Sequence, residues 1–506
     1  MLLLLAALGA SLDLAVPAQA PQALARPGSA MEKAWDAWEA DRFDEAVKLA
    51  TPLARAGNGE ALYLLASAHD FGVGAKQDRA EAARLYRRSA DAGFAAAYAP
   101  LGLLHERGEG VPKDIAKANA LYREGVDKED ETARYYLANN LYNGFGIAAD
   151  HAAAVKLART GVTAGDPRAM HLLGIAYDQG LGIAEDDSLA VDLFRRCADL
   201  GEVNCDHSLG VMHEHGRGVP RDLKQALTFY EKAAENGSTG ALVAAGVIHR
   251  EGEAGPADPA KAVDYFRRAA DADDTGGMFQ LAEAYRTGTL GLAKDAAKAL
   301  ELLKEAAEAG DSSAMVQLGW IYELGEGARE DAAVAVSWYR KAAAAGDSIG
   351  ITNLGVMYKN GRGVTADHKE SVRLFEKAAA LGDLRAQMLL GLSYVDGEGV
   401  AKDPKKGFDM VARAAAAGEL EATAELGLLH QLGLGTRKDE ATAVRLFREA
   451  ADKGDARGMR FLGAAYADGI GVAKSKEEAL IWLRKATAAG DQEAGRILMA
   501  LIFGGK

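Results

Sequence analysis

Basic residues are in deficit in this sequence. The 506 residues include 59 Lys and Arg against 73 Asp and Glu, which gives a net charge of −14 and a pI near 5.3. A nucleic-acid-binding surface is usually basic, and electrostatic binding to anionic lipid needs clustered Lys and Arg. The composition therefore argues against a nucleic-acid partner and against an electrostatic hold on a membrane surface.

Long apolar runs and familiar catalytic motifs are also lacking. No stretch after the N-terminal segment approaches the roughly 20 apolar residues of a membrane span, so we expect no integral span. The chain has no H-E-x-x-H sequence, no Walker-type loop and no paired catalytic carboxylates. We therefore predict no catalytic residue, no metal site and no cofactor.

Proline is scarce and glycine is abundant, with 11 and 58 residues. Regularly spaced glycine with little proline predicts many helix ends rather than a flexible linker. Hydrophobic residues make up 49% and charged residues 26%, which is typical of a globular chain. A length of 506 residues predicts several domains or a repeat array.

Residues 1–29 read as a secretory signal peptide followed by a short linker. An apolar run precedes Ala18 and Ala20, which form an Ala-x-Ala cleavage pattern; cleavage after Ala18 or Ala25 is also possible. No Lys or Arg precedes the run, and Asp13 interrupts it. We predict a periplasmic or secreted protein. The alternative is a misassigned start and a cytoplasmic protein.

From Gly59 onward the sequence repeats with a period of 36 residues. Twelve full units cover residues 59–491, with one inserted residue before Ser312. A helix pair at 30–58, which contains Trp35 and Trp38, precedes them, and a single helix at 492–506 follows. These atypical ends are typical of a capped solenoid. The sequence therefore predicts an all-α fold, an α-solenoid.

Each unit reads as a first helix, a turn and a second helix. Its eighth residue is always Gly or Ala, as at Gly319, which predicts close approach of a neighbouring helix. The first helix ends at a Gly-x-Gly pair, and four residues later an Asp such as Asp331 is expected to cap the second helix. The second helix carries a core aromatic or aliphatic residue such as Tyr339.

The motif L-G-x-x-Y, the turn G-x-G-V, the Asp, and then K-A-x-x-x-Y/F-x-K-A-A-x-x-G-D resemble the Sel-like repeat family. This family is a branch of the tetratricopeptide-type helical repeats, and the resemblance spans about Gly59 to Asp491. It implies a right-handed superhelix of antiparallel helix pairs. It also implies an adaptor that binds other proteins, in bacteria often in the periplasm or outside the cell.

Two adjacent units depart from the pattern. Ala254 replaces the second turn Gly of one unit, Asp273 replaces its closing Gly, and the next unit carries the only insertion, around Thr289 and Leu290. We predict a hinge or a change of superhelical curvature within residues 252–295. A tolerated loop variation is the alternative.

Cys197 and Cys205 are the only cysteines, and they flank the tight turn between two units. The pair resembles that of cysteine-rich secreted members of the family, which staple this junction. Spacing and resemblance together indicate a disulfide, as suits an oxidising compartment. Buried free thiols are the alternative. A metal site with His207, His213 and His215 would lack any recognised ligand spacing.

Two further patterns are explained by the repeat structure rather than by a chemical function. Gly346 to Gly350 matches G-x-S-x-G, but that motif needs a strand-turn-helix context, and here it spans a junction between helical units. Some cysteine-rich relatives have been described as β-lactamases, yet the Ser-x-x-Lys pattern is absent.

Five units carry His where others have Tyr; we interpret these as packing residues, with a pH-sensing ladder as the alternative. They are His69, His105, His213, His249 and His430.

A binding surface remains, because stacked helical repeats form an extended concave face. The resemblance implies that first helices line this face, where aromatic and amide side chains suit peptide binding. The candidates are Tyr63, Tyr135, Tyr136, Asn139, Asn140, His171, His207, Phe279, Gln280 and Trp320, and some must instead belong to the core between units.

We therefore predict a non-enzymatic scaffold that binds a protein or peptide in envelope assembly, regulation or host contact. A scaffold for cell-envelope carbohydrate is the alternative, which a row of solvent-facing aromatics would favour. A β-lactam hydrolase is a remote third.

Overall fold

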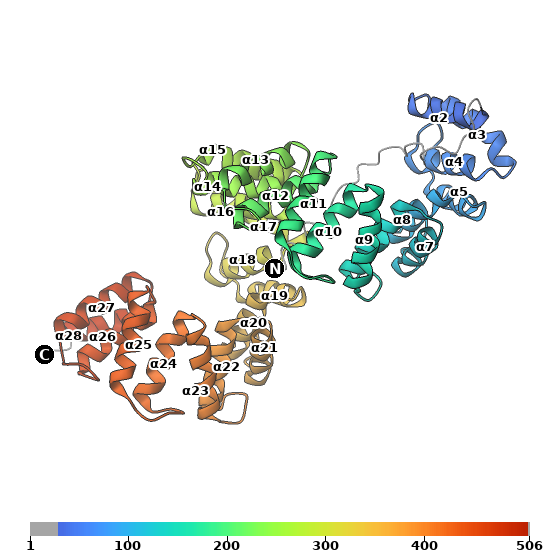
Figure 1. Cartoon of the computed structure of the whole chain (residues 1–506). Coiled ribbons are helices and arrows are strands. Elements are labelled where there is room, and N and C mark those ends of the chain that lie inside the picture. The colour runs from blue at the N-terminus through green and yellow to red at the C-terminus, as the bar shows by residue number, and fades with distance from the viewer. Residues whose placement is uncertain (1–28, 504–506) are drawn as a thin grey trace. The chain divides into compact units, whose positions relative to one another are not determined.

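The computed structural model describes residues 29–503. Within this range the chain forms 27 α-helices and one short 3-10 helix, with no strand. The predicted all-α solenoid is confirmed, because consecutive helices pair and stack in chain order within residues 30–271 and within residues 275–503 (Figure 1). The predicted signal peptide and linker lie outside the described residues, apart from Ser29, and so do residues 504–506 of the C-terminal cap.

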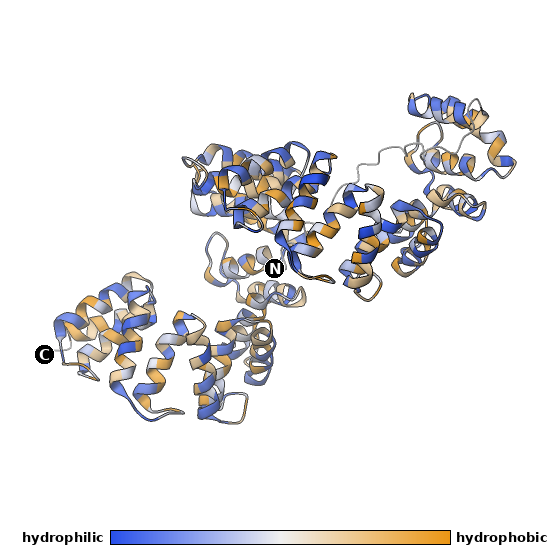
Figure 2. Ribbon diagram, viewed as in Figure 1, coloured by the Kyte–Doolittle hydropathy of each residue, from blue (hydrophilic) through white to orange (hydrophobic). Residues whose placement is uncertain are grey.

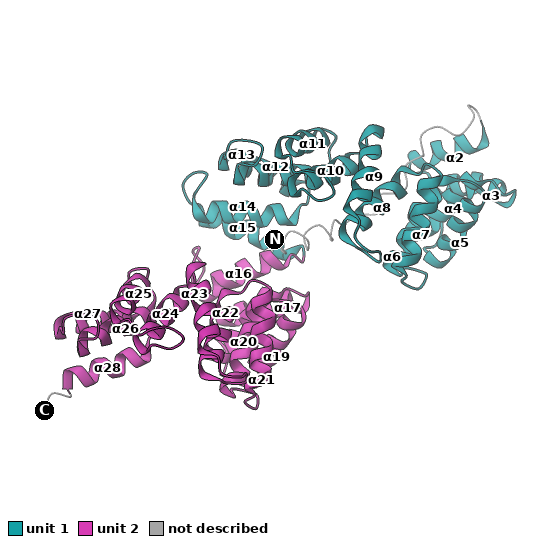
Figure 3. Ribbon diagram, turned by 60° about the horizontal axis from the view of Figure 1, so that its bottom comes forward, with its two compact units in different colours: residues 1–272 teal, residues 273–506 magenta. Residues whose placement is uncertain are grey.

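The helices belong to two compact units, residues 1–272 and residues 273–506 (Figure 3). The boundary falls inside the segment 252–295, and the hinge proposed there stays a prediction. The helices of the first unit are α2 (Ala30–Glu39), α3 (Phe43–Arg55), α4 (Gly59–Phe71), α5 (Arg79–Asp91), η1 (Ala95–Ala97), α6 (Tyr98–Arg107), α7 (Ile115–Asp127), α8 (Glu131–Asn143), α9 (His151–Ala164), α10 (Pro167–Gln179), α11 (Asp187–Asp199), α12 (Val203–His215), α13 (Leu223–Glu235), α14 (Thr239–Glu251) and α15 (Pro259–Asp271).

The second unit contains the remaining repeats and the last helix. Its helices are α16 (Thr275–Thr287), α17 (Ala296–Glu308), α18 (Ser312–Leu324), α19 (Ala332–Ala344), α20 (Ser348–Asn360), α21 (His368–Ala380), α22 (Leu384–Asp396), α23 (Pro404–Ala416), α24 (Leu420–Leu432), α25 (Glu440–Asp452), α26 (Ala456–Asp468), α27 (Lys476–Ala488) and α28 (Gln492–Phe503).

Local chemistry sets the helix ends. Before α20, Asp347 Oδ1 accepts from the Gly350 N–H at 2.8 Å, and Gly361 ends the helix at φ 65°. Before α19, Asp331 Oδ1 accepts from the N–H groups of Ala333 and Val334 at 3.0 and 3.1 Å. An N-cap acceptor and a left-handed C-cap Gly satisfy groups that the helix leaves unpaired. The predicted capping pattern is confirmed at these ends.

The eighth residue of each unit lets the paired helices approach closely. A Cβ added to Gly355 would lie only 2.6 Å from Cε1 of Phe375, the core aromatic of α21. In the same way the ring of Tyr339 occupies the space beside Gly319. Small residues at this position therefore make room for a fully buried ring. Along the helices, apolar and polar residues interleave rather than form long blocks (Figure 2).

The turns of the two irregular repeats depart from the regular Gly pattern, as does Glu129 with φ 62° in an earlier repeat. Ala254 does not have the positive φ of the turn glycine that it replaces, whereas Asp273 has φ 59° and Leu290 has φ 56°. Left-handed backbone is tolerated by Asp and strained for Leu.

No helix in the described part of the chain is both long and apolar enough to cross a bilayer.

Candidate partner-binding face

Most first helices leave one face less covered than the rest, whereas in α4 the corresponding residues Leu64 and Ser67 are buried. In α18 this face consists of the second, sixth, ninth and thirteenth residues of the repeat, namely Ser313, Gln317, Trp320 and Leu324. A spacing of four, three and four residues keeps them on one side of a helix with 3.6 residues per turn. We call the corresponding residues of all the first helices the open strip.

Neighbouring first helices contact one another, as α6 does with α8 and α24 with α26. Within residues 29–503, no two second helices approach each other as extensively. In a curved stack, the row of helices with closer neighbours lies on the inner side. The open strip therefore belongs to the inner side of each unit.

Five of the predicted residues occupy the fifth position of a repeat, and three of them, Tyr63, His171 and His207, have ring contacts with a second helix. The ring centroids of Tyr63 and Tyr86 are 5.6 Å apart, and those of His171 and Phe194 are 5.7 Å apart. Tyr63 and His171 therefore help to form the packing within a repeat. The five residues are Tyr63, Tyr135, His171, His207 and Phe279.

His171 is the most enclosed of these five. Its side chain is buried, and its Nε2 lies 3.0 Å from Ser208 Oγ on the next first helix. Burial, with a smaller effect of His207, lowers the pKa of His171 to about 4. The imidazole is therefore neutral at pH 7 and joins α10 to α12.

Tyr135 and Tyr136 also pack inside the first unit. Tyr136 stacks on Tyr122 of the preceding second helix, with ring centroids 5.5 Å apart. Tyr135 lies under the guanidinium of Arg168, 4.7 Å from its ring. It stands beside Ala158, which occupies the place of the usual core aromatic. Tyr135 thus fills space that the second helix leaves.

The predicted amides are largely engaged within the chain. Asn140 is buried, and its Nδ2 donates to Glu106 Oε2 at 3.1 Å and to Asn119 Oδ1 at 3.0 Å. Asn139 accepts from Asn143 at 3.0 Å. Gln280 is half-buried on α16. These contacts give each of the two asparagines a structural role.

Trp320 alone among the ten predicted residues is exposed, with 37% of its surface accessible. It lies in the second unit with Phe279 and Gln280, and the other seven predicted residues lie in the first unit. The ten predicted residues are therefore divided between the two units.

Around Trp320 the structure reveals apolar residues that the sequence-based choice missed. Leu324 is 61% exposed and Ile349 is 47% exposed, and both lie on the open strip. Half-buried apolar residues continue the strip at the ninth position of the next repeats. They are Val356, Leu392 and Leu428. Their recurrence every 36 residues is the signal that could have found them.

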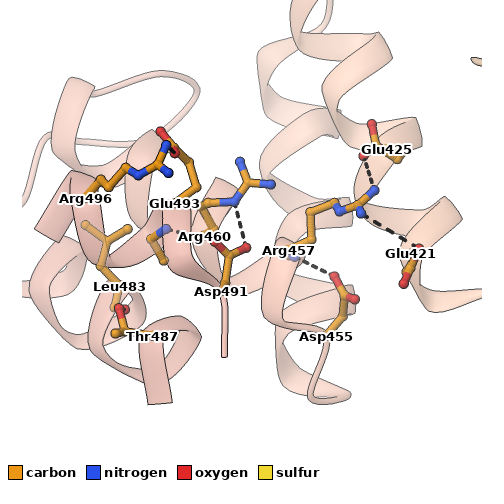
Figure 4. A network of polar contacts seen from close by, with 12 residues as sticks. Glu421, Glu425, Asp455, Arg457, Arg460, Leu483, Thr487, Asp491, Glu493 and Arg496 are labelled. Carbon is orange, nitrogen blue, oxygen red and sulfur yellow. Dashed lines mark hydrogen bonds and ion pairs between the residues drawn. The ribbon is translucent and has the colours of Figure 1, made fainter. Parts of the chain in front are cut away.

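Toward the C-terminus the open strip becomes charged. Arg457 on α26 donates to Glu425 Oε1 at 2.6 Å and lies 3.9 Å from Glu421, both on α24 (Figure 4). Arg385 on α22 lies 3.8 Å from Glu421 and donates to Asn353 Oδ1 at 3.1 Å. These four helices therefore share an alternating polar network.

Asn353 has a buried hydrogen-bond donor without a partner among the described residues. Its Nδ2 is buried and has no hydrogen-bond partner in the part of the chain that the structure describes. An unpaired buried donor costs roughly 1–3 kcal/mol. The Asn353 oxygen accepts from Arg385, so the atom without a partner is the Nδ2 donor.

Cys197 and Cys205 form the predicted disulfide between α11 and α12, with Cα atoms 6.0 Å apart. Within residues 29–503, no group of three His, Cys, Asp or Glu residues is placed to hold a metal ion.

Comparison with known proteins identifies the repeat. Twelve consecutive segments match the Sel1 repeat: residues 59–94, 95–130, 132–166, 167–202, 205–238, 240–274, 276–311, 312–347, 348–383, 384–419, 420–455 and 456–491. The chain belongs to the Sel1 repeat family. Sel1 repeat proteins mediate protein–protein interactions. No curated protein matches the chain.

Solved structures similar to this Sel1 repeat chain include proteins from several bacteria. A protective antigen of uropathogenic Escherichia coli with an SLR fold is 29% identical and has a TM-score of 0.49; the match covers 83% of this chain and 90% of that one. A Sel1 repeat protein from Oxalobacter formigenes is 31% identical, with 61% and 90% covered and a TM-score of 0.45. Cysteine rich protein B of Helicobacter pylori is 28% identical, with 26% and 95% covered and a TM-score of 0.23.

The G-x-S-x-G segment lies at an ordinary junction between two Sel1 repeats. Ser348 is the first residue of α20, directly after the turn that follows α19. Asp347 is engaged in capping that helix and accepts from Ser312 Oγ at 2.9 Å. The strand that a nucleophile elbow requires is therefore replaced by a helix.

Three of the five histidines in the usual Tyr position pack against rings of second helices, namely His213, His249 and His430. His213 stacks on Phe229 at 5.5 Å between centroids, and His249 stacks on Tyr265 at 5.7 Å. Burial, followed by the charge of Arg195, lowers the pKa of His213. These contacts support the packing interpretation.

Proposed function

We propose that the protein is an exported scaffold that binds a protein or peptide partner on the inner, concave side of its repeats. The exposed apolar side chains of the open strip carry this proposal. Trp320, Leu324 and Ile349 place large apolar surface in solvent on adjacent helices. Grouped exposed apolar residues typically mark interaction sites. Membership of the Sel1 repeat family supports the same function.

Two features support export. The Cys197–Cys205 disulfide suits an oxidising compartment. The apolar N-terminal segment, outside the described residues, has the composition of a signal peptide. An exported scaffold of this kind would serve envelope assembly, regulation or host contact.

The arrangement of aromatic residues favours a protein partner over carbohydrate. In the described part of the chain the exposed aromatic residues are Phe145, Trp320 and Phe503. They lie on different elements and form no row along one groove. Stacking against successive sugars would need such a row.

Site-specific photocrosslinking tests the proposed function. A photoreactive amino acid in place of Trp320 should give a covalent adduct with an envelope protein. The same substitution at Leu381, which is 54% exposed just after α21, serves as control and should give none. Equal adducts from both positions, or none from Trp320, would contradict binding at this face.

A further inference from the structure

We propose that residues 144–151 and 180–189, which we call the turn edge, bind a basic, amphipathic segment of a partner protein. These residues form the Gly-x-Gly turns after α8 and α10 and the starts of α9 and α11, all within the first unit. The turn edge lies past the C-terminal ends of the first helices rather than on the open strip. The inference therefore goes beyond the proposed function and does not rest on it.

In half of the repeats, the residue that follows the first turn Gly makes an ion pair with the preceding repeat. Arg217, for example, lies 2.7 Å from Asp178. The six residues with such a pair are Glu109, Arg217, Glu253, Glu326, Arg362 and Glu398. In the third and fourth repeats this residue is apolar, namely Phe145 and Leu181. These two turns therefore replace a charged contact within the chain by an apolar side chain.

Phe145 and Leu181 are more exposed than apolar residues at the same turn position elsewhere. Phe145 is 48% exposed and Leu181 is 37% exposed. Val73 and Leu434, at this position in other repeats, are half-buried and pack against core clusters. Leu189, in the first turn of α11, is 44% exposed and adds a third apolar side chain to the turn edge. Such a group of exposed apolar residues typically marks an interaction site.

The two turns are neighbours in space. Just before them, the Tyr142 hydroxyl donates to Gln179 Oε1 at 3.0 Å, which joins the end of α8 to the end of α10. A Cβ added to Gly182 would lie 2.3 Å from the backbone oxygen of His151, so the second turn packs on the start of α9. One partner segment can therefore contact both turns.

The turn edge is acidic. It contains four carboxylates and no Lys or Arg, and these carboxylates are Asp150, Glu185, Asp186 and Asp187. Over the corresponding residues of the flanking repeats, 108–117 and 216–225, Lys and Arg balance or outnumber Asp and Glu. Arg217 on the next turn is paired with Asp178. A basic side chain of a partner would find unbalanced negative charge at the turn edge and not at the turns beside it.

The combination of apolar and acidic side chains selects the chemistry of the partner. An acidic segment would be repelled by the four carboxylates, and a purely basic segment would leave Phe145 and Leu181 in water. Exposed ion pairs are individually weak and are screened by salt. The apolar contacts would therefore supply most of the affinity, and the basic residues would supply selectivity and a salt dependence.

The test uses the full chain and a phage-displayed library of random 12-residue peptides. The library is first depleted on the double variant Phe145→Ser/Leu181→Ser and then selected on the unaltered chain. We expect the retained peptides to combine apolar residues with an excess of Lys and Arg over Asp and Glu. Absence of enrichment over the depleted library, or enrichment of uncharged or acidic peptides, would overturn the proposal.

Fluorescence anisotropy then measures the affinity of a selected peptide, made synthetically with acetylated and amidated ends. Phe145→Ser and Leu181→Ser should each weaken binding about tenfold. The pair Glu185→Gln and Asp187→Asn should weaken it about fivefold; Asp186 is left unchanged because its Oδ1 caps α11. Raising the NaCl concentration from about 50 to about 300 mM should weaken binding to the unaltered chain more than to this charge variant. An equal salt dependence would contradict the role of the carboxylates.

Matched controls remove the same kinds of side chain elsewhere. Leu381→Ser with Leu432→Ser removes two leucines, each 54% exposed, from the second unit. Glu235→Gln with Asp271→Asn removes two exposed carboxylates from the first unit. Both controls should bind like the unaltered chain, and a control that binds as weakly as its matching turn-edge variant would overturn the assigned site.

Two further measurements separate this surface from folding and from the open strip. Circular dichroism establishes that each variant folds, as expected because the Phe145 turn is held by its backbone oxygen, which accepts from Asn119 Nδ2 at 2.7 Å. Trp320→Ala should leave the peptide affinity unchanged. Loss of affinity in that variant would place the peptide on the open strip and overturn the turn-edge site, whereas photocrosslinking at Trp320 tests the proposed function by itself.

Discussion

Buried tyrosines of four second helices donate to a carboxylate sixteen residues earlier in the chain. Tyr230 donates to Glu214 at 2.6 Å, and the others are Tyr86, Tyr122 and Tyr339. Where the core ring is Phe266, the corresponding residue is Arg250. At these positions a buried hydroxyl therefore occurs with an acceptor, as burial of a polar group requires.

Removing the Tyr230 hydroxyl tests how much its hydrogen bond to Glu214 stabilises the folded chain. In Tyr230→Phe the Glu214 carboxylate loses its buried donor, and we expect a loss of roughly 1.5–3 kcal/mol in the free energy of unfolding. Urea denaturation followed by circular dichroism measures it. Tyr177→Phe is the control, since its half-buried hydroxyl accepts only a long bond, 3.4 Å, from Arg159. Equal losses in both variants would contradict the role of the carboxylate.

His171 predicts a pH dependence at the same scale. Its pKa in the folded protein is lowered to about 4, below the value of about 6.5 in an unfolded chain. The unfolded state therefore binds more protons between these values. The contribution of His171 to stability is complete above pH 6.5 and is lost as pH falls toward 4, by about 3 kcal/mol.

Hydrogen exchange of the α10 amides at pH 7 and pH 4.5 measures this loss. The matched variant is His171→Phe, because Phe279 occupies the same position in a later repeat. It should show a smaller loss of protection at pH 4.5 than the unaltered chain. An identical loss would show that His171 does not carry the acid sensitivity.

At the scale of the helix pair, close approach depends on a missing side chain. In Gly355→Ala the new Cβ would meet the ring of Phe375 at 2.6 Å. Overpacking of this kind typically costs 1–3 kcal/mol, and the melting temperature reports it. Adding Phe375→Leu creates the Ala–Leu pair seen at Ala282 and Leu303, and it should recover part of the loss. A double variant less stable than Gly355→Ala would contradict steric conflict as the cause.

At the scale of the whole molecule, the Cys197–Cys205 disulfide is expected to stabilise the folded chain. Replacing Cys197 and Cys205 together by Ala removes a bridge across an eight-residue separation. We expect the free energy of unfolding to fall by roughly 2–3 kcal/mol, measured by urea denaturation. A reducing agent should destabilise the original chain and leave the variant unchanged. Reductant sensitivity in the variant would contradict the assignment.

The proposed hinge belongs to the same scale. Fluorescent labels on α10 and α22 would report the distance between the two units by single-molecule energy transfer. We expect a broad distribution, because Ala254 and the insertion at Leu290 interrupt the regular turn pattern. Labels on α18 and α24, within one unit, should give a narrow distribution. A narrow distribution for both pairs would refute the hinge.

The repeat, the helix ends and the all-α class followed from the sequence because they depend on local chemistry. A left-handed backbone favours Gly361, and an N-cap needs an acceptor such as Asp331 at a fixed offset. The disulfide followed from spacing and resemblance. Trp320 could be singled out because it differs from its counterparts in the other repeats.

Tertiary packing alone decided which first-helix residues face solvent. His171 is the fifth residue of its repeat and Trp320 is the ninth residue of its own, and both lie on a first helix. His171 is nevertheless buried, whereas Trp320 is exposed. The difference depends on the direction from which the second helix covers the first. Asn140 likewise looks like a groove residue until its partners Glu106 and Asn119 are seen. Those partners come from earlier helices, so pairing across more than twenty residues of sequence, rather than residue type, determines which side chains remain for a partner.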